Sequence, residues 1–170
     1  MIQWFPDIHP RGALYNENGY ELLVWLEENE GKNMYAPKAI IIDDDPGVLA
    51  CLRRILQGRG FNVLTYENPV HSPLFKDKEC PCSLRDDGCP DLIISDFCMP
   101  MMNGVALLEF TMQKGCRCRH LALISGYGVE KEDMNRLASY GARYFLKPIS
   151  NDFYSWLNEV SLDAAVHHAA

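Results

Sequence analysis

The chain has 170 residues, of which 48% are hydrophobic and 23% charged, and its formal net charge at pH 7 is -7. This size predicts one domain, and the acidic charge without a dense Lys/Arg run argues against direct nucleic-acid binding. No apolar run reaches membrane-spanning length and the first residues lack a signal-peptide pattern, so we expect no membrane insertion and a cytoplasmic location.

Residues 1–36 precede the first predicted strand. They contain one helical pattern, from Tyr20 to Glu28, in which apolar residues recur at the helical period. Gly31-Lys32-Asn33 would end that helix. The segment shows no pattern of catalytic residues and is short for an independent fold, so we interpret it as an extension that packs on the main domain or on a partner.

Residues 38–42 form an apolar run that predicts a buried strand, and three aspartates follow it. Asp45 can cap the next helix, with Pro46 at its first position, where a missing N–H costs nothing. Asp43 and Asp44 are left without a structural role. Adjacent carboxylates repel each other, which is tolerable where a hard divalent cation balances their charge.

A second strand is predicted over residues 61–66. The segment that follows contains Pro69, Pro73 and Pro81, which predict a short, broken helix.

The third strand ends on an aspartate. Leu92 to Ile94 form a continuous apolar run bounded by turn residues, which is typical of a strand buried on both faces. Asp96 would lie at the carboxyl end of this strand, where open α/β sheets bind ligands. A lone aspartate in this position could equally begin a turn.

The rest of the chain continues the alternation. Residues 104–113, 130–140 and 152–160 show helical periodicity, and residues 121–124 and 144–146 predict strands. Such alternation predicts a parallel sheet with helices on both faces, and right-handed crossovers bring the strand ends to one edge. That edge would gather Asp43, Asp44, Asp96, Ser125 and Lys147.

The order of these motifs resembles the receiver domain of two-component response regulators. The resemblance covers residues 38–160 and is carried by the segments IIIDDDP (40–46), IISDFCMPMMNG (93–104), LISGYG (123–128) and YFLKP (144–148). It implies a flavodoxin-like α/β fold, a five-stranded parallel sheet of order 2-1-3-4-5 flanked by helices on both faces. We therefore divide the chain into an N-terminal extension (1–36), a receiver domain (37–162) and a C-terminal tail (163–170).

The resemblance also implies the chemistry of the site. Asp96 would be the phospho-acceptor, taking a phosphoryl group from a phosphohistidine to form an acyl phosphate. Asp43, Asp44, Asp96 and the backbone carbonyl of Cys98 would hold Mg²⁺.

Two further side chains would contact the phosphoryl oxygens: Lys147 by charge and Ser125 by a hydrogen bond. Either Tyr144 or Phe145 would change rotamer on phosphorylation, and we favour Tyr144. Cys98 and Tyr127 would border the path of the hydrolytic water.

The implied partners are a sensor histidine kinase or phosphotransfer protein and a downstream protein, and the chain could also form a homodimer. After the last predicted helix too few residues remain for an output domain, so we expect a phosphorelay or partner-binding role rather than a turnover enzyme. One alternative is a receiver-like interaction module that is not phosphorylated. Another is a haloacid-dehalogenase-type hydrolase with Asp43 as nucleophile and Asp45 as acid/base, but its acidic metal motif should follow Lys147, whereas Asp96 precedes it.

The seven cysteines suggest reduced thiols or metal ligands, because the cytosol disfavours disulfides. Six residues before the third and fourth strands would lie together at the amino edge of the sheet: Cys80, Cys82, Cys89, Cys116, Cys118 and His120. Four of them could hold a structural Zn²⁺, although their spacing is not that of common zinc sites, and a redox pair or unliganded thiols are the alternatives. Cys51 is predicted to lie in the core.

Overall fold

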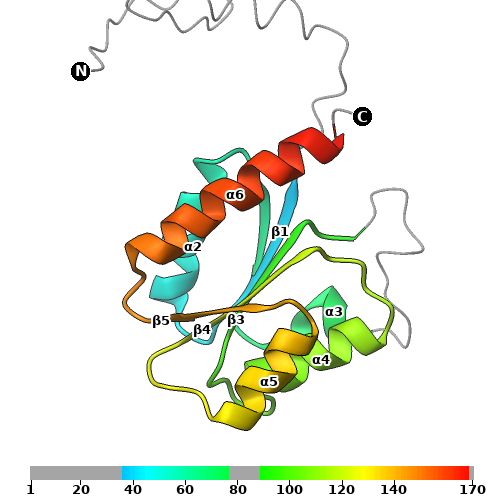
Figure 1. Ribbon diagram of the computed structural model, residues 1–170, viewed down its shortest axis with the longest axis vertical. Helices are drawn as coiled ribbons and strands as arrows, with labels where there is room; N and C mark the ends of the chain where they lie inside the picture. The colour runs from blue at the N-terminus through cyan, green and yellow to red at the C-terminus, as the bar shows by residue number, and fades with distance from the viewer. Residues whose placement is uncertain (1–35, 77–88, 169–170) are drawn as a thin grey trace, which may run out of the picture. The chain divides into compact units, whose positions relative to one another are not determined.

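The computed structural model describes residues 36–76 and 89–168 (Figure 1). The predicted helix from Tyr20 to Glu28 lies outside these residues. The elements, in chain order, are β1 (Lys38–Ile42), α2 (Pro46–Gln57), β2 (Asn62–Tyr66), the 3₁₀ turn η1 (Pro69–His71), α3 (Pro73–Lys76), β3 (Leu92–Asp96), α4 (Gly104–Gln113), β4 (His120–Ser125), α5 (Lys131–Ser139), β5 (Arg143–Leu146) and α6 (Asn151–His168).

The five strands form one parallel sheet in the order β2-β1-β3-β4-β5. This confirms the predicted fold class and strand order. All five residues of β3 are buried, which explains why its sequence is a continuous apolar run rather than an alternating one.

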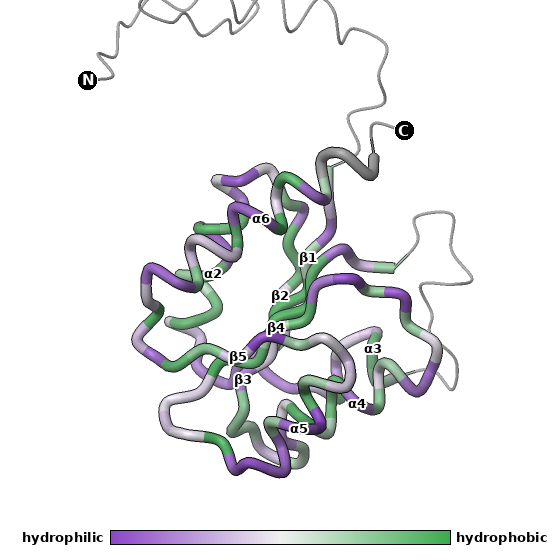
Figure 2. The backbone as a smooth tube through the Cα atoms, viewed as in Figure 1, coloured by the Kyte–Doolittle hydropathy of each residue, from purple (hydrophilic) through white to green (hydrophobic). Residues whose placement is uncertain are grey.

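Helices cover both faces of the sheet (Figure 1). Because side chains alternate along a strand, successive residues of β1 enter different cores. Ile41 packs with α2 and α6, whereas Ile40 and Ile42 pack with α3, α4 and α5. The hydropathy colouring shows the apolar central strands between the two helical layers (Figure 2).

Side-chain caps fix where two of the helices begin. The Asp45 carboxylate accepts hydrogen bonds from the amides of Gly47 (2.7 Å) and Val48 (3.3 Å), with Pro46 at the first helical position, as predicted. The Asn103 side chain accepts one from the amide of Ala106 (2.8 Å), which begins α4 directly after the loop that follows Asp96.

Two expectations from the sequence differ from the structure. Cys51 is exposed rather than in the core, because the buried stripe of α2 runs through Leu49, Leu52 and Leu56. The last helix continues past Val160 to His168, since Ala164 extends its buried face and is 0% exposed. Across the described ranges, no helix is both long and apolar enough to cross a membrane.

Candidate functional site

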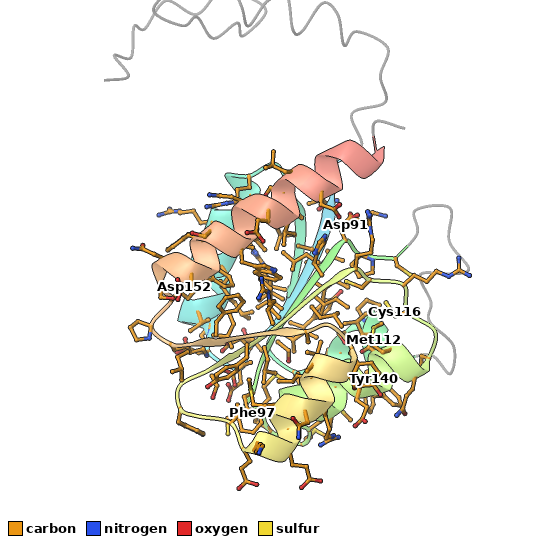
Figure 3. All side chains as sticks on the ribbon, viewed as in Figure 1. Asp91, Phe97, Met112, Cys116, Tyr140 and Asp152 are labelled. Carbon is orange, nitrogen blue, oxygen red and sulfur yellow. The ribbon has the colours of Figure 1, made fainter. Side chains whose placement is uncertain are left out.

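The candidate site lies at the carboxyl ends of the strands. Phe97 follows β3 there, and Asp91 precedes β3 at the opposite end of the sheet (Figure 3). Asp43 follows β1, Asp96 ends β3, Ser125 ends β4, and Lys147 follows β5. Parallel pairing of these four strands places the predicted residues at one edge.

Lys147 joins two of the carboxylates. Its ammonium donates hydrogen bonds to Asp43 Oδ2 (2.8 Å) and Asp96 Oδ1 (2.6 Å). The two aspartates are only 1% and 5% exposed. The Lys147 backbone amide also donates to the Ser125 carbonyl (2.7 Å), which ties the start of this loop to β4. Charges this deeply buried are tolerated when they are paired, as they are here.

The same arrangement shifts two pKa values. Burial raises the pKa of Asp43, and the opposing effects of Lys147 and the Asp45 amide do not cancel it. For Lys147, burial opposes the charged form most strongly, yet the hydrogen bonds to Asp43 and Asp96 raise its pKa overall. Lys147 is therefore a cation at neutral pH, and Asp43 is harder to ionise than an ordinary aspartate.

The residues available for a divalent cation are Asp43, Asp44 and Asp96, whose carboxylate oxygens are the donors that Mg²⁺ prefers. Asp44 is exposed, whereas the other two point at Lys147. Within residues 36–76 and 89–168, no three Asp, Glu, His or Cys side chains are arranged to hold a metal ion. The donor set thus fits Mg²⁺ chemically, but the Lys147 ammonium lies between the two buried carboxylates.

Ser125 and Tyr144 are connected through Tyr127. Ser125 is 1% exposed, and its Oγ accepts a hydrogen bond from the Tyr127 amide (3.2 Å). The Tyr144 hydroxyl donates to the Tyr127 carbonyl (2.9 Å). Tyr144 packs on the side of α4 and α5, whereas Phe145 packs against α2 and α6. Of the two candidate aromatic residues, Tyr144 is therefore the one that contacts the loop after Ser125.

Tyr127 also contacts the loop after Asp96. Its hydroxyl donates to Cys98 Sγ (2.8 Å), and the Cys98 amide donates to Asp96 Oδ2 (2.5 Å). The hydrogen bond to Cys98 is the main cause of a raised pKa for Tyr127. The hydroxyl therefore stays protonated, and able to donate, at neutral pH. Sequence reasoning placed both residues near the site but had no signal for this bond, which joins two separate loops.

Only part of the predicted cysteine cluster lies within the described residues. Cys80 and Cys82 lie outside them. Cys89 does lie beside the loop before β4, where its Sγ accepts a hydrogen bond from the Arg117 amide (3.3 Å). The described parts of the chain contain no metal-binding group, as noted above, and the His120 imidazole contacts Asp163 Oδ2 at 2.8 Å.

The two remaining cysteines belong to the core. Cys116 and Cys118 are 4% and 5% exposed and pack on the side of the sheet that α4 and α5 cover; Figure 3 marks Cys116 at the end of α4. Cys116 and Cys118 thus pack in the core, and the zinc or redox cluster, which also involves Cys80 and Cys82, stays a prediction.

Comparison with protein families gives a match to the response regulator receiver domain over residues 39–153. Comparison with curated proteins gives no match.

Similar solved structures include several receiver proteins. A CheY-like receiver domain protein from Methanospirillum hungatei is 20% identical, with 78% of this chain and 99% of that chain covered and a TM-score of 0.59. The chemotaxis protein CheY4 of Vibrio cholerae is 22% identical, with 74% and 99% covered and a TM-score of 0.56. A response regulator from Burkholderia pseudomallei, solved with a phosphorylated aspartic acid, a calcium ion and citrate, is 21% identical, with 78% and 71% covered and a TM-score of 0.53. At these identities the structures support the fold alone.

Proposed function

Because this chain belongs to the response regulator receiver domain family, we propose that it accepts a phosphoryl group on Asp96 and thereby changes a partner-binding surface. The observation that carries the proposal is the pair of hydrogen bonds from Lys147 to Asp43 and Asp96, which unites three strand ends around one candidate nucleophile. The phosphorylated aspartic acid in the Burkholderia pseudomallei relative is consistent with this chemistry.

In the proposed reaction, an Asp96 carboxylate oxygen attacks phosphorus in line with the bond to the donor nitrogen of a phosphohistidine. The new O–P bond forms as the N–P bond breaks, and the histidine leaves. Lys147 is already beside Asp96 and would pair with a phosphoryl oxygen. Ser125 would donate a hydrogen bond to another, so that positioning and electrostatics do most of the work.

Asp43, Asp44, Asp96 and the Cys98 carbonyl would hold Mg²⁺, which neutralises charge on the transferring group when bound. Lys147 would have to release Asp43 for this, because its ammonium lies between the carboxylates.

The proposed partners are a sensor histidine kinase or phosphotransfer protein upstream and a protein downstream. The chain would be phosphorylated once per signalling event, so it is a signalling domain rather than a turnover enzyme.

The test is intact-mass spectrometry after incubation with acetyl phosphate and Mg²⁺. Wild type should gain one phosphoryl group, and the gain should disappear in Asp96→Asn and when Mg²⁺ is chelated. Asp152→Asn is the matched control, because Asp152 is exposed in the first turn of α6 and should not affect the adduct.

Folded wild-type protein that gains no mass would contradict the proposal and favour an interaction module that is not phosphorylated. An adduct that persists in Asp96→Asn would place the acceptor elsewhere.

A further inference from the structure

β2 forms one edge of the sheet. Among the described residues it pairs with one neighbouring strand, β1, because it stands first in the strand order. The Asn62 amide donates to the Pro37 carbonyl (2.7 Å), so the backbone of Asn62 faces β1. Alternate residues of a strand face the same way, and Val63 and Thr65 therefore direct their N–H and C=O groups away from the sheet. These groups are in position to pair with a further strand.

The sequence of β2 contains no residue that would block such pairing. Natural sheets protect an edge with charged residues, proline or a bulge, whereas the segment NVLTY (62–66) has neither charge nor proline and keeps an unbroken register with β1. Its central residue, Leu64, is 49% exposed. The opposite edge differs, because β5 begins with the exposed Arg143 and is soon followed by Pro148. Of the two edges, β2 is therefore the one open to an added strand.

Arg53 on α2 adds a positive charge beside this edge. Its side chain is exposed, and its guanidinium donates a hydrogen bond to the Thr65 hydroxyl. In the ranges that the structure describes, no carboxylate pairs with this guanidinium. Because a guanidinium has five N–H donors, the bond to Thr65 leaves others for a carboxylate. Side chains alternate along a strand, so Arg53 lies on the face of β2 that carries Thr65, and Leu64 points to the other face.

We propose that the edge of β2 binds an extended, acidic segment of a partner protein, which adds to the sheet as a sixth strand. The backbone of this segment pairs with Val63 and Thr65. One of its carboxylates pairs with Arg53, and the apolar side chain next to that carboxylate packs on Leu64. Because the two contacts lie on opposite faces, the acidic and apolar residues must be adjacent in the partner's sequence. This inference goes beyond the proposed function and does not depend on phosphorylation.

A second copy of this chain fits the edge less well than an acidic segment does. Two β2 strands paired in antiparallel fashion around Leu64 would place Val63 of each copy opposite Thr65 of the other. The two Arg53 guanidiniums, each beside Thr65, would then lie close together with no carboxylate between them, and they would repel each other. The charge at this edge thus favours a partner with an acidic side chain.

The experiment adds a synthetic peptide to the full chain, without any phosphodonor, and measures amide hydrogen exchange by NMR. The probe is acetyl-Thr-Val-Asp-Val-Thr-amide at millimolar concentration. It should slow exchange at the outward amides of Val63 and Thr65 about tenfold once about nine in ten edges are occupied. The amides of Tyr144 and Leu146, which face outward on the opposite edge, are the internal control and should exchange as before.

Variants test the charge and the apolar contact separately. Arg53→Gln and a peptide with Asn in place of Asp should each weaken binding about fivefold, and combining them should weaken it no further, because both remove the same ion pair. Leu64→Ala removes the apolar contact and should also weaken binding about fivefold. Leu162→Ala, a change at another exposed leucine, on α6, is the matched control and should leave the affinity unchanged.

Unchanged exchange at Val63 and Thr65, or protection at Tyr144 and Leu146 instead, would overturn the inference. Equal affinity for the Asp and Asn peptides would refute an acidic partner. Protection of Val63 and Thr65 without peptide, increasing with protein concentration, would show that a second copy occupies the edge and would also overturn the inference. Because no phosphodonor is present, these results are independent of whether Asp96 is phosphorylated.

Discussion

Replacing Gly104 by alanine tests how closely α4 approaches the site. A Cβ at this position would lie 2.1 Å from the Asp96 carbonyl oxygen, 2.5 Å from Leu123 Cδ1 and 2.9 Å from Ser95 Oγ. The carbonyl is held by a hydrogen bond from the Ser95 hydroxyl (2.9 Å), so it cannot turn away freely. The added methyl group must therefore push the start of α4 away from the end of β3.

Overpacking a buried position costs about 1–3 kcal/mol, and a backbone contact this short belongs at the upper end of that range. Alanine offsets up to about 1 kcal/mol of this loss in unfolding free energy through its better helix propensity and its lower entropy in the unfolded chain. We expect a net loss of about 2 kcal/mol in the free energy of unfolding. In urea titrations followed by circular dichroism, this corresponds to a midpoint about 1 M lower.

Gly128→Ala is the matched control. Nothing lies within 4 Å of a Cβ built at Gly128, so its free energy of unfolding should stay within about 0.5 kcal/mol of wild type. Equal stability of the two variants would refute the close approach at Gly104. Because the displaced carbonyl belongs to Asp96, Gly104→Ala should also slow phosphoryl transfer to this residue.

Three other predictions follow from the ionic contacts. Burial raises the pKa of Asp43, so ionisation of this carboxyl opposes folding. In urea titrations without divalent cation, wild type should therefore lose stability relative to Asp43→Asn as the pH rises from about 4 through the raised pKa. The same pH dependence in both proteins would contradict this. Lys147→Met should tighten Mg²⁺ binding about tenfold in calorimetric titrations, because the ammonium that bridges Asp43 and Asp96 would no longer compete with Mg²⁺ for these carboxylates. Weaker Mg²⁺ binding by the variant would show that Lys147 assists the cation instead. Glu109→Gln should lower the free energy of unfolding by about 0.5–1 kcal/mol, because the ion pair between Glu109 on α4 and Arg136 on α5 is partly exposed. This loss should be smaller in 1 M NaCl, and a loss that does not depend on salt would rule out a charge effect.

Local sequence patterns account for the parts of the fold that the sequence alone predicted. Apolar runs such as Leu92 to Ile94 predict buried strands because a strand covered on both faces has no polar side to display. The alternation of such runs with helical periods then predicted a parallel sheet, and the resemblance to receiver domains implied the strand order that the structure confirms. The start of α2 could also be predicted from the sequence, because Asp45 and Pro46 affect only the backbone of the next few residues.

Contacts between segments could not be derived in that way. The sequence placed Lys147, Asp43 and Asp96 at one edge but did not show that one ammonium bridges both carboxylates across 104 and 51 residues. It also placed Cys51 in the core, because a small apolar residue on a helix gives no sign of which side of the buried stripe it occupies.

The sequence by itself determined the fold class and which polar residues stand at the strand ends, because both depend on periodicity and on chain direction. The strand order came from the resemblance to receiver domains. Only the tertiary structure decided which of these residues touch. The link from Asp96 through Cys98 and Tyr127 to Tyr144 depends on the paths of two loops and on rotamers chosen by packing. These rotamers depend on contacts with residues that are distant in the sequence, so no local sequence pattern predicts them.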